Sequence, residues 1–155
     1  MDSIFSELEP AGTGTSQRFR STTGVFSLSL TTTTDASQEA AMRERAAQNQ
    51  TMDLDSDFFD DYGKVLNLWS RNAFVCFMKY NSAAKPLLGA DPSGILEATW
   101  ERGEERLSIR FDERHRLSYA ISYLDPQGVR RRKWDASSLA TFFSDCPNAK
   151  RIALI

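Results

Sequence analysis

The sequence predicts an α+β fold: a four-stranded antiparallel β-meander packed against one long helix and a short C-terminal helix, with an N-terminal arm. Between residues 94 and 134, apolar and polar residues alternate in successive runs that short turn sequences separate, as is typical of antiparallel strands. Between residues 57 and 80, apolar residues recur every three or four positions, as is typical of a helix. The chain of 155 residues is long enough for one domain with a single core.

The arm is expected in residues 1–34, which are rich in Ser, Thr and Gly, and the α+β domain in residues 35–155. Within the arm, apolar residues alternate from Val25 to Leu30 and predict a short strand with Phe26, Leu28 and Leu30 on one side. We favour an edge strand of the chain's own sheet. The alternatives are addition to the sheet of a second copy or to the sheet of a partner.

Two helices are predicted before the sheet. Residues 36–49 follow Asp35, a capping residue, and contain only small apolar residues, so this helix is expected to pack shallowly. Residues 57–80 form the stronger helix, because one stripe holds Phe58, Tyr62, Val65, Leu66, Trp69, Ala73, Cys76, Phe77 and Tyr80. Further apolar residues widen this face, so we expect the helix to be buried on more than one side or to cover a partner.

The predicted strands have one apolar face. It consists of Leu96, Ala98 and Trp100, then Leu107, Ile109 and Phe111, then Leu117, Tyr119, Ile121 and Tyr123. The opposite face carries small side chains at Ser108, Ser118, Ala120 and Ser122. Such a face suits either a groove for another segment or a solvated surface. A basic fourth strand ends the meander at Trp134. A helix is expected over 136–145. The apolar tail, residues 152–155, is expected to dock on the domain.

The location of the protein is predicted from what the sequence lacks. The N-terminus has no secretory signal pattern, and no apolar run reaches the about 20 residues that a membrane helix needs. Cys76 and Cys146 are too far apart for a zinc spacing and do not form a disulfide framework, so we expect reduced thiols. A cytoplasmic protein without membrane contact is predicted. The net charge of −2 does not by itself indicate a nucleic-acid partner.

An acidic stretch precedes the long helix and consists of Asp53, Asp55, Asp57, Asp60 and Asp61. Its first three aspartates resemble the start of a calcium loop, but Phe58 stands where the loop needs Gly and Lys64 where it needs Glu. We therefore predict no metal site. The aspartates are interpreted as helix caps and solvated charge, or as a contact for a basic partner surface.

The basic strand contains Arg130, Arg131, Arg132, Lys133 and Trp134. Positive charge beside an aromatic residue suits phosphate contacts and base stacking, so nucleic-acid binding is an alternative hypothesis. Protection of an edge strand is the favoured interpretation, because alternate residues of a strand point to opposite faces and divide the charge. His115 is the only histidine and has no metal or triad partner nearby in the sequence. No cofactor and no enzymatic activity are predicted.

The segments Gly94–Trp100, Arg106–Phe111 and Leu117–Ile121 resemble the β-meander half of small, poorly characterised bacterial and phage proteins. Some of those are described as toxin-antitoxin or phage-associated components. The resemblance implies no catalytic residues. Together with the absence of a chemical motif, it favours a non-catalytic protein-protein interaction module, such as an antitoxin, an immunity protein or a phage-encoded inhibitor of a host enzyme. The expected partner is another protein, with a homodimer as a further option. The expected contact residues are Phe26, Leu28 and Leu30 of the arm and the five aspartates.

Overall fold

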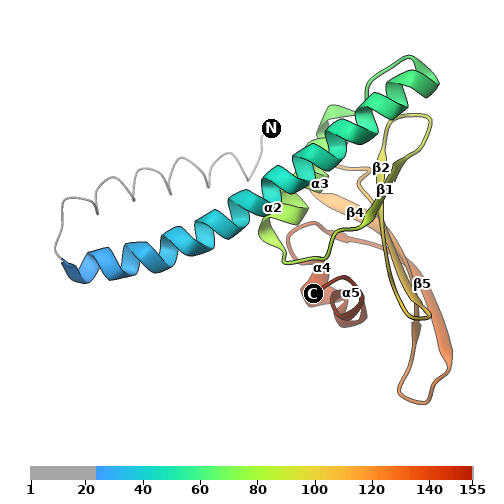
Figure 1. Ribbon diagram of the computed structural model, residues 1–155. Coiled ribbons are helices and arrows are strands. Elements are labelled where there is room, and N and C mark those ends of the chain that lie inside the picture. Colours follow the sequence, from blue (N-terminus) through green and yellow to red (C-terminus); the bar gives the residue numbers. More distant parts are fainter. Residues whose placement is uncertain (1–23, 155) are drawn as a thin grey trace. The chain divides into compact units, whose positions relative to one another are not determined.

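The computed structural model describes the backbone of residues 24–154 and the side chains of residues 35–154. The chain divides into two compact units, Met1–Met42 and Arg43–Ile155. The elements are α2 (Gly24–Tyr62), α3 (Leu68–Tyr80), β1 (Leu87–Ala90), β2 (Leu96–Arg102), β3 (Glu105–Arg110), β4 (Arg116–Leu124), β5 (Arg130–Ser138), α4 (Phe142–Asp145) and α5 (Pro147–Ala153). The strands form one antiparallel sheet in sequence order, shown in Figure 1. The fold class is α+β.

Within residues 24–154 the sheet has five strands, where the sequence predicted four. The additional strand, β1, has four residues and pairs with β2 so that Leu88 lies opposite Ala98. Its sequence, Leu-Leu-Gly-Ala, has no alternation of polar and apolar residues, because it is short and contains no polar residue. Periodicity alone could therefore not reveal it.

The boundaries of the first helices differ from the prediction. Residues 24–62 form one helix, so the predicted strand at Phe26, Leu28 and Leu30 is wrong, and the side chains of these three residues lie outside those described. The helix predicted over 57–80 is divided between the end of α2 and α3. Gly63 ends α2 with a φ of 70°, which glycine adopts without strain, and its N–H donates to the carbonyl oxygen of Phe59 at 2.8 Å.

The C-terminal elements also differ. β5 extends to Ser138, so the helix predicted over 136–145 is confined to the single turn of α4. The last helix, α5, begins at Pro147, a residue suited to the first helical position. It buries Ile152 and Ala153, and the N–H of Ala84 donates to the carbonyl oxygen of Ala153 at 2.7 Å. The expected docking of the apolar tail is thus confirmed for these two residues.

The core lies on one face of the sheet. The predicted inward residues of the three central strands are buried, apart from Tyr123, which is half-buried. Figure 1 shows α3, α4 and α5 on this side. The ring of Phe77 lies 5.7 Å from Phe111, 6.2 Å from Trp100 and 5.4 Å from Phe143, measured between centroids. Phe77 therefore joins α3 to the sheet and to α4.

The part of α2 from Arg43 onward pairs with α3 as an antiparallel helical hairpin. At one end, the Arg43 guanidinium donates to the carbonyl oxygen of Lys79 at 2.9 Å. At the other end, Arg71 lies 3.1 Å from the carboxylate of Asp55. Asp55 also accepts the N–H of Leu66 at 2.8 Å, which holds the connection between the two helices against α2.

Ser70 connects α3 to the ends of two strands and is fully buried. Its hydroxyl donates to the carbonyl oxygen of Phe111 at 2.7 Å and accepts the N–H of Leu96 at 2.9 Å. Leu96 and Phe111 are fully buried, so the contact fixes where α3 lies on the sheet.

Replacing Ser70 by Ala is expected to destabilise the protein by roughly 1–3 kcal/mol, because it leaves two buried backbone groups without a partner. Denaturant unfolding of the full chain measures the change. The matched control is Ser82→Ala, at an exposed position, with an expected change within about 0.5 kcal/mol. Equal stability of the two variants would contradict this role of Ser70.

Candidate protein-binding surfaces

The end of the helical hairpin exposes several large apolar side chains. Their exposed fractions are 60% for Met52, 55% for Phe59, 50% for Tyr62, 65% for Val65 and 67% for Leu68. We call these five residues the apolar tip. They lie within 17 residues of sequence: Phe59 and Tyr62 lie in the last turn of α2, Val65 in the connection and Leu68 at the start of α3, whereas Met52 lies more than two turns before the end of α2. A monomeric protein seldom exposes so many large apolar side chains in one region unless the region binds something.

The tip results from the way the hairpin turns. Phe58 of α2 and Leu66 of the connection point inward and are buried, whereas Phe59 and Val65 beside them are exposed. Tyr62 and Val65 were predicted to lie on a buried stripe. Both are exposed, so this part of the prediction is wrong: Tyr62 is the last residue of α2, and Val65 lies after the break at Gly63, outside both helices.

Four exposed aspartates lie on another strip of α2. Asp57 lies four residues after Asp53, and Asp60 and Asp61 lie three and four residues after Asp57, so all four lie within about 100° of the helix circumference. None of them forms an ion pair with a residue whose side chain the structure describes. We call them the acidic strip. The buried residues Ala47, Thr51 and Phe58 lie between this strip and the side of α2 that holds Met52 and Phe59.

The acidic strip does not serve the stability of α2. Asp60 and Asp61 lie in the last turn of the helix, which contains no basic residue. Carbonyl groups make this end of a helix negative, so carboxylates there are unfavourable by a few tenths of a kcal/mol to about 1 kcal/mol each. Asp55, the fifth predicted aspartate, is different, since it binds Arg71 and the N–H of Leu66 within the chain.

The basic residues of β5 divide between the two faces of the sheet, as predicted. Most have acidic neighbours: Arg130 lies 3.4 Å from Glu104, Arg131 lies 3.0 Å from Asp125, and Lys133 lies 4.0 Å from Asp135. Arg132 has no acidic partner among the described side chains. Trp134 is 75% exposed. This pairing leaves little positive charge for a nucleic acid.

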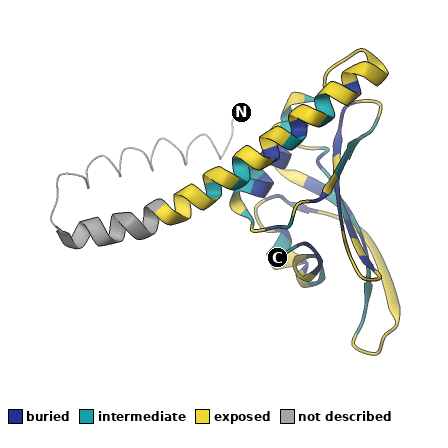
Figure 2. Ribbon diagram, viewed as in Figure 1, coloured by how far each residue is buried: buried dark blue, intermediate teal, exposed yellow. Residues whose placement is uncertain are grey.

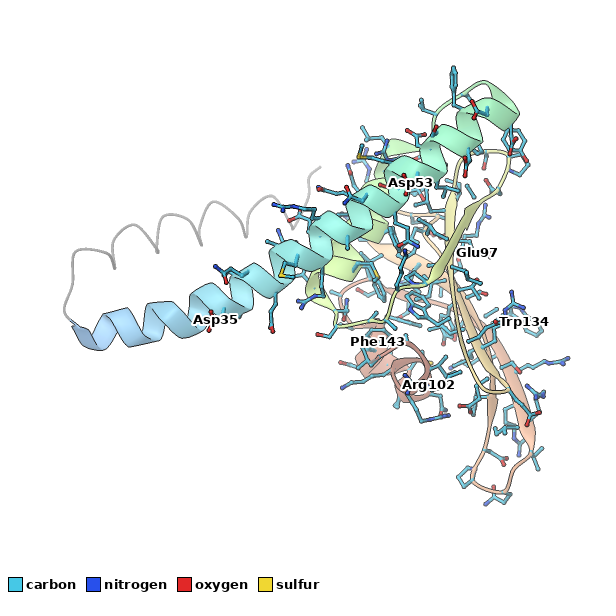
Figure 3. The ribbon with its side chains drawn as sticks, viewed as in Figure 1. Asp35, Asp53, Glu97, Arg102, Trp134 and Phe143 are labelled. Carbon is cyan, nitrogen blue, oxygen red and sulfur yellow. The ribbon has the colours of Figure 1, made fainter. Side chains whose placement is uncertain are left out.

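A shallow groove of about 200 Å³ lies on the face of the sheet opposite the core. Ser108, Ala120 and Ser122 form its floor, and Arg106, Arg132 and Trp134 surround them. Figure 3 shows Trp134 on the side of the sheet away from Phe143 of α4. Three of the four small residues predicted on this face, Ser108, Ala120 and Ser122, therefore line a hollow, whereas Ser118 does not. A stripe of small residues does not by itself identify an occupant.

Ionisable groups with shifted pKa values have structural partners. Burial would raise the pKa of Asp91, but hydrogen bonds from Ser93 and Ile95 and the neighbouring Arg110 lower it to about 2. Hydrogen bonds from Arg151 lower the pKa of Glu105 against the effect of burial. Asp91 closes the turn before β2, and Glu105 joins β3 to α5. Neither carboxylate lines the groove.

The remaining residues that could support chemistry lie in different elements of the described part of the chain. No three His, Cys, Asp or Glu side chains gather where a metal ion could bind among these residues. Cys76 and Cys146 form no disulfide with each other. None of the described helices combines the length and the apolar character that a membrane crossing requires. His115 lies exposed in the turn between β3 and β4.

Comparisons of the chain with protein-family models, with curated proteins and with solved structures found no match.

Replacing both Asp60 and Asp61 by Asn is expected to stabilise the protein by roughly 0.5 kcal/mol per residue, since it removes negative charge from the negative end of α2. Thermal unfolding at low salt measures the gain. Asp53→Asn is the matched control, because Asp53 lies more than two turns before the helix end and should give no gain. If the double variant is less stable than the natural chain, the acidic strip supports the fold and our interpretation of it is wrong.

Proposed function

We propose that this protein is a non-catalytic protein-binding module, such as an antitoxin, an immunity protein or a phage-encoded inhibitor of a host enzyme. The observation that supports this proposal most strongly is the apolar tip. Five large side chains that are at least half exposed cost free energy in water, and contact with another protein would recover it. Tyrosine, phenylalanine and methionine are also enriched at the centres of protein interfaces.

The chemistry of the tip indicates the kind of partner. A concave apolar surface would receive Phe59, Tyr62 and Leu68 at the end of the hairpin, in the manner of a helix that binds in a groove. Lysine or arginine residues along one side of that groove would face the acidic strip. Their charge would offset the repulsion among the aspartates and their unfavourable position at the end of α2. We therefore propose a partner with an apolar groove and a basic border.

Charge at the border of such an interface acts mainly on the rate of association, whereas buried apolar contacts determine how long the complex lasts. The four aspartates would thus guide the hairpin towards the partner. Phe59 and Leu68 would provide most of the affinity, because burial of large apolar side chains contributes about 1.5–3 kcal/mol each.

The test uses the full chain isolated from its own host, with native mass spectrometry to find a companion protein present in a fixed ratio. The double variant Phe59→Ser with Leu68→Ser is expected to weaken binding of that companion by roughly a hundredfold or more, since each contact contributes about 1.5 kcal/mol or more. Its own unfolding midpoint should change little, because both side chains are exposed in the isolated protein.

The matched control is Leu87→Ser, which replaces a side chain of comparable exposure (71%) on β1. It should bind the companion normally. If the tip variant keeps the companion, or if the natural chain has no companion in a fixed ratio, the proposed function is wrong.

Nucleic-acid binding through β5 is the alternative function, and the exposed Trp134 beside Arg132 is the observation that favours it. It predicts an affinity for single strands that falls steeply with salt and falls further when Arg130 and Arg132 are both replaced by Gln. A filter-binding or fluorescence-anisotropy titration at several salt concentrations measures this. We expect no such binding, because most of the positive charge of β5 already has an acidic neighbour.

A further inference from the structure

β5 is an edge strand, and its outer side is open from Arg130 to Ala136 in the described part of the chain, whereas Ser137 is buried and hydrogen-bonded to Asp145 of α4. β5 pairs with β4 alone, it is nine residues long, and every residue from Arg130 to Ala136 is exposed, as Figure 2 shows. An edge of this length exposes a row of backbone donors and acceptors that another strand can pair with.

The outward backbone groups of β5 belong to alternate residues. The N–H of Ala136 donates to the side chain of Asp135 at 2.8 Å rather than to β4, so it points away from the sheet. Because N–H groups point to alternating sides along a strand, those of Arg130, Arg132 and Trp134 point the same way. A further strand could therefore form hydrogen-bonded pairs with these four residues.

The sequence of β5 is complementary to itself in one antiparallel register. If two copies meet with Trp134 opposite Trp134, each Lys133 lies opposite Asp135 of the other copy. In the same register Arg132 faces Ala136, Arg131 faces Ser137 and Arg130 faces Ser138, so no two like charges meet. A shift of one residue, with Lys133 opposite itself, brings two ammonium groups together.

Trp134 is the second reason to expect this pairing. Repulsion between basic side chains would be enough to protect an edge strand, and it does not need a tryptophan that is 75% exposed at the middle of the strand. In the register described here, the two indole rings would lie side by side on the groove face across the symmetry axis, where aromatic cross-strand pairs are favourable.

We propose that the chain forms a symmetric dimer in which the β5 strands of two copies pair antiparallel about Trp134 and join the two sheets into one. The partner is a second copy of this chain, and the contact is isologous, with two Lys133–Asp135 pairs related by the two-fold axis. The proposal concerns a surface that the proposed function does not use, so either can fail without the other.

The test measures the mass of the full chain in solution by sedimentation over a dilution series. The natural chain should reach the mass of a dimer as its concentration rises. Lys133→Glu and Asp135→Lys should each weaken the dimer by about tenfold or more, because each places like charges opposite one another twice. The double variant Lys133→Glu with Asp135→Lys should restore the dimer, since the opposite charges then face each other again.

Two controls distinguish the proposed register from a shifted register and from a loss of folding. Arg131→Glu should leave the dimer intact, because Arg131 faces Ser137, whereas the shifted register pairs Arg131 with Asp135 and predicts a loss. Unfolding midpoints show whether a variant still folds, which matters for Lys133 because it is hydrogen-bonded to Tyr119. A natural chain that stays monomeric at every soluble concentration would overturn the proposal, as would a folded double variant that stays monomeric.

Discussion

The contact on which the rest of the structure depends is the packing of Phe77 against rings from β2, from the end of β3 and from α4. Phe77 is almost completely buried, and Ser70, two turns earlier on α3, fixes the same helix to the backbone at Leu96 and Phe111. Because α3 and the two C-terminal helices are all held on one face of the sheet, the opposite face stays open. The exposed groove on that face follows from this one-sided arrangement.

The sequence was sufficient to predict the central strands, because their apolar side chains alternate and short turns separate them. Leu96, Leu107 and Leu117 are buried where that alternation placed them. It was insufficient for β1, which is four residues long, and for the end of β5, where Ser137 and Ser138 give no signal. It also misplaced residues 24–34, because Phe26, Leu28 and Leu30 alternate like a strand although their backbone is helical. Their periodicity over six residues is too short to decide between helix and strand.

The candidate site could be predicted only in part. The acidic stretch was visible as composition, but the internal role of Asp55 depends on Arg71 and Leu66, which the turn at Gly63 brings back to it. The exposure of the apolar tip was not predicted, because the apolar residues on both sides of Gly63 fit one continuous helical pattern. A glycine in the middle of that pattern was the available signal, since glycine commonly ends helices. The pairing of Arg130 and Arg131 with Glu104 and Asp125 required the register of the sheet and could not be read from charge counts.

The central claim is that the exposed residues at the end of the helical hairpin bind another protein and do not stabilise the fold. Hydrogen exchange of the full chain, alone and in the complex isolated from its host, tests it most directly. We predict slower exchange of the backbone amides from Phe59 to Leu68 in the complex, with unchanged exchange in α5, which the hairpin contact does not involve. Slower exchange that is confined to other elements, with the Phe59 to Leu68 segment unchanged, would contradict the account.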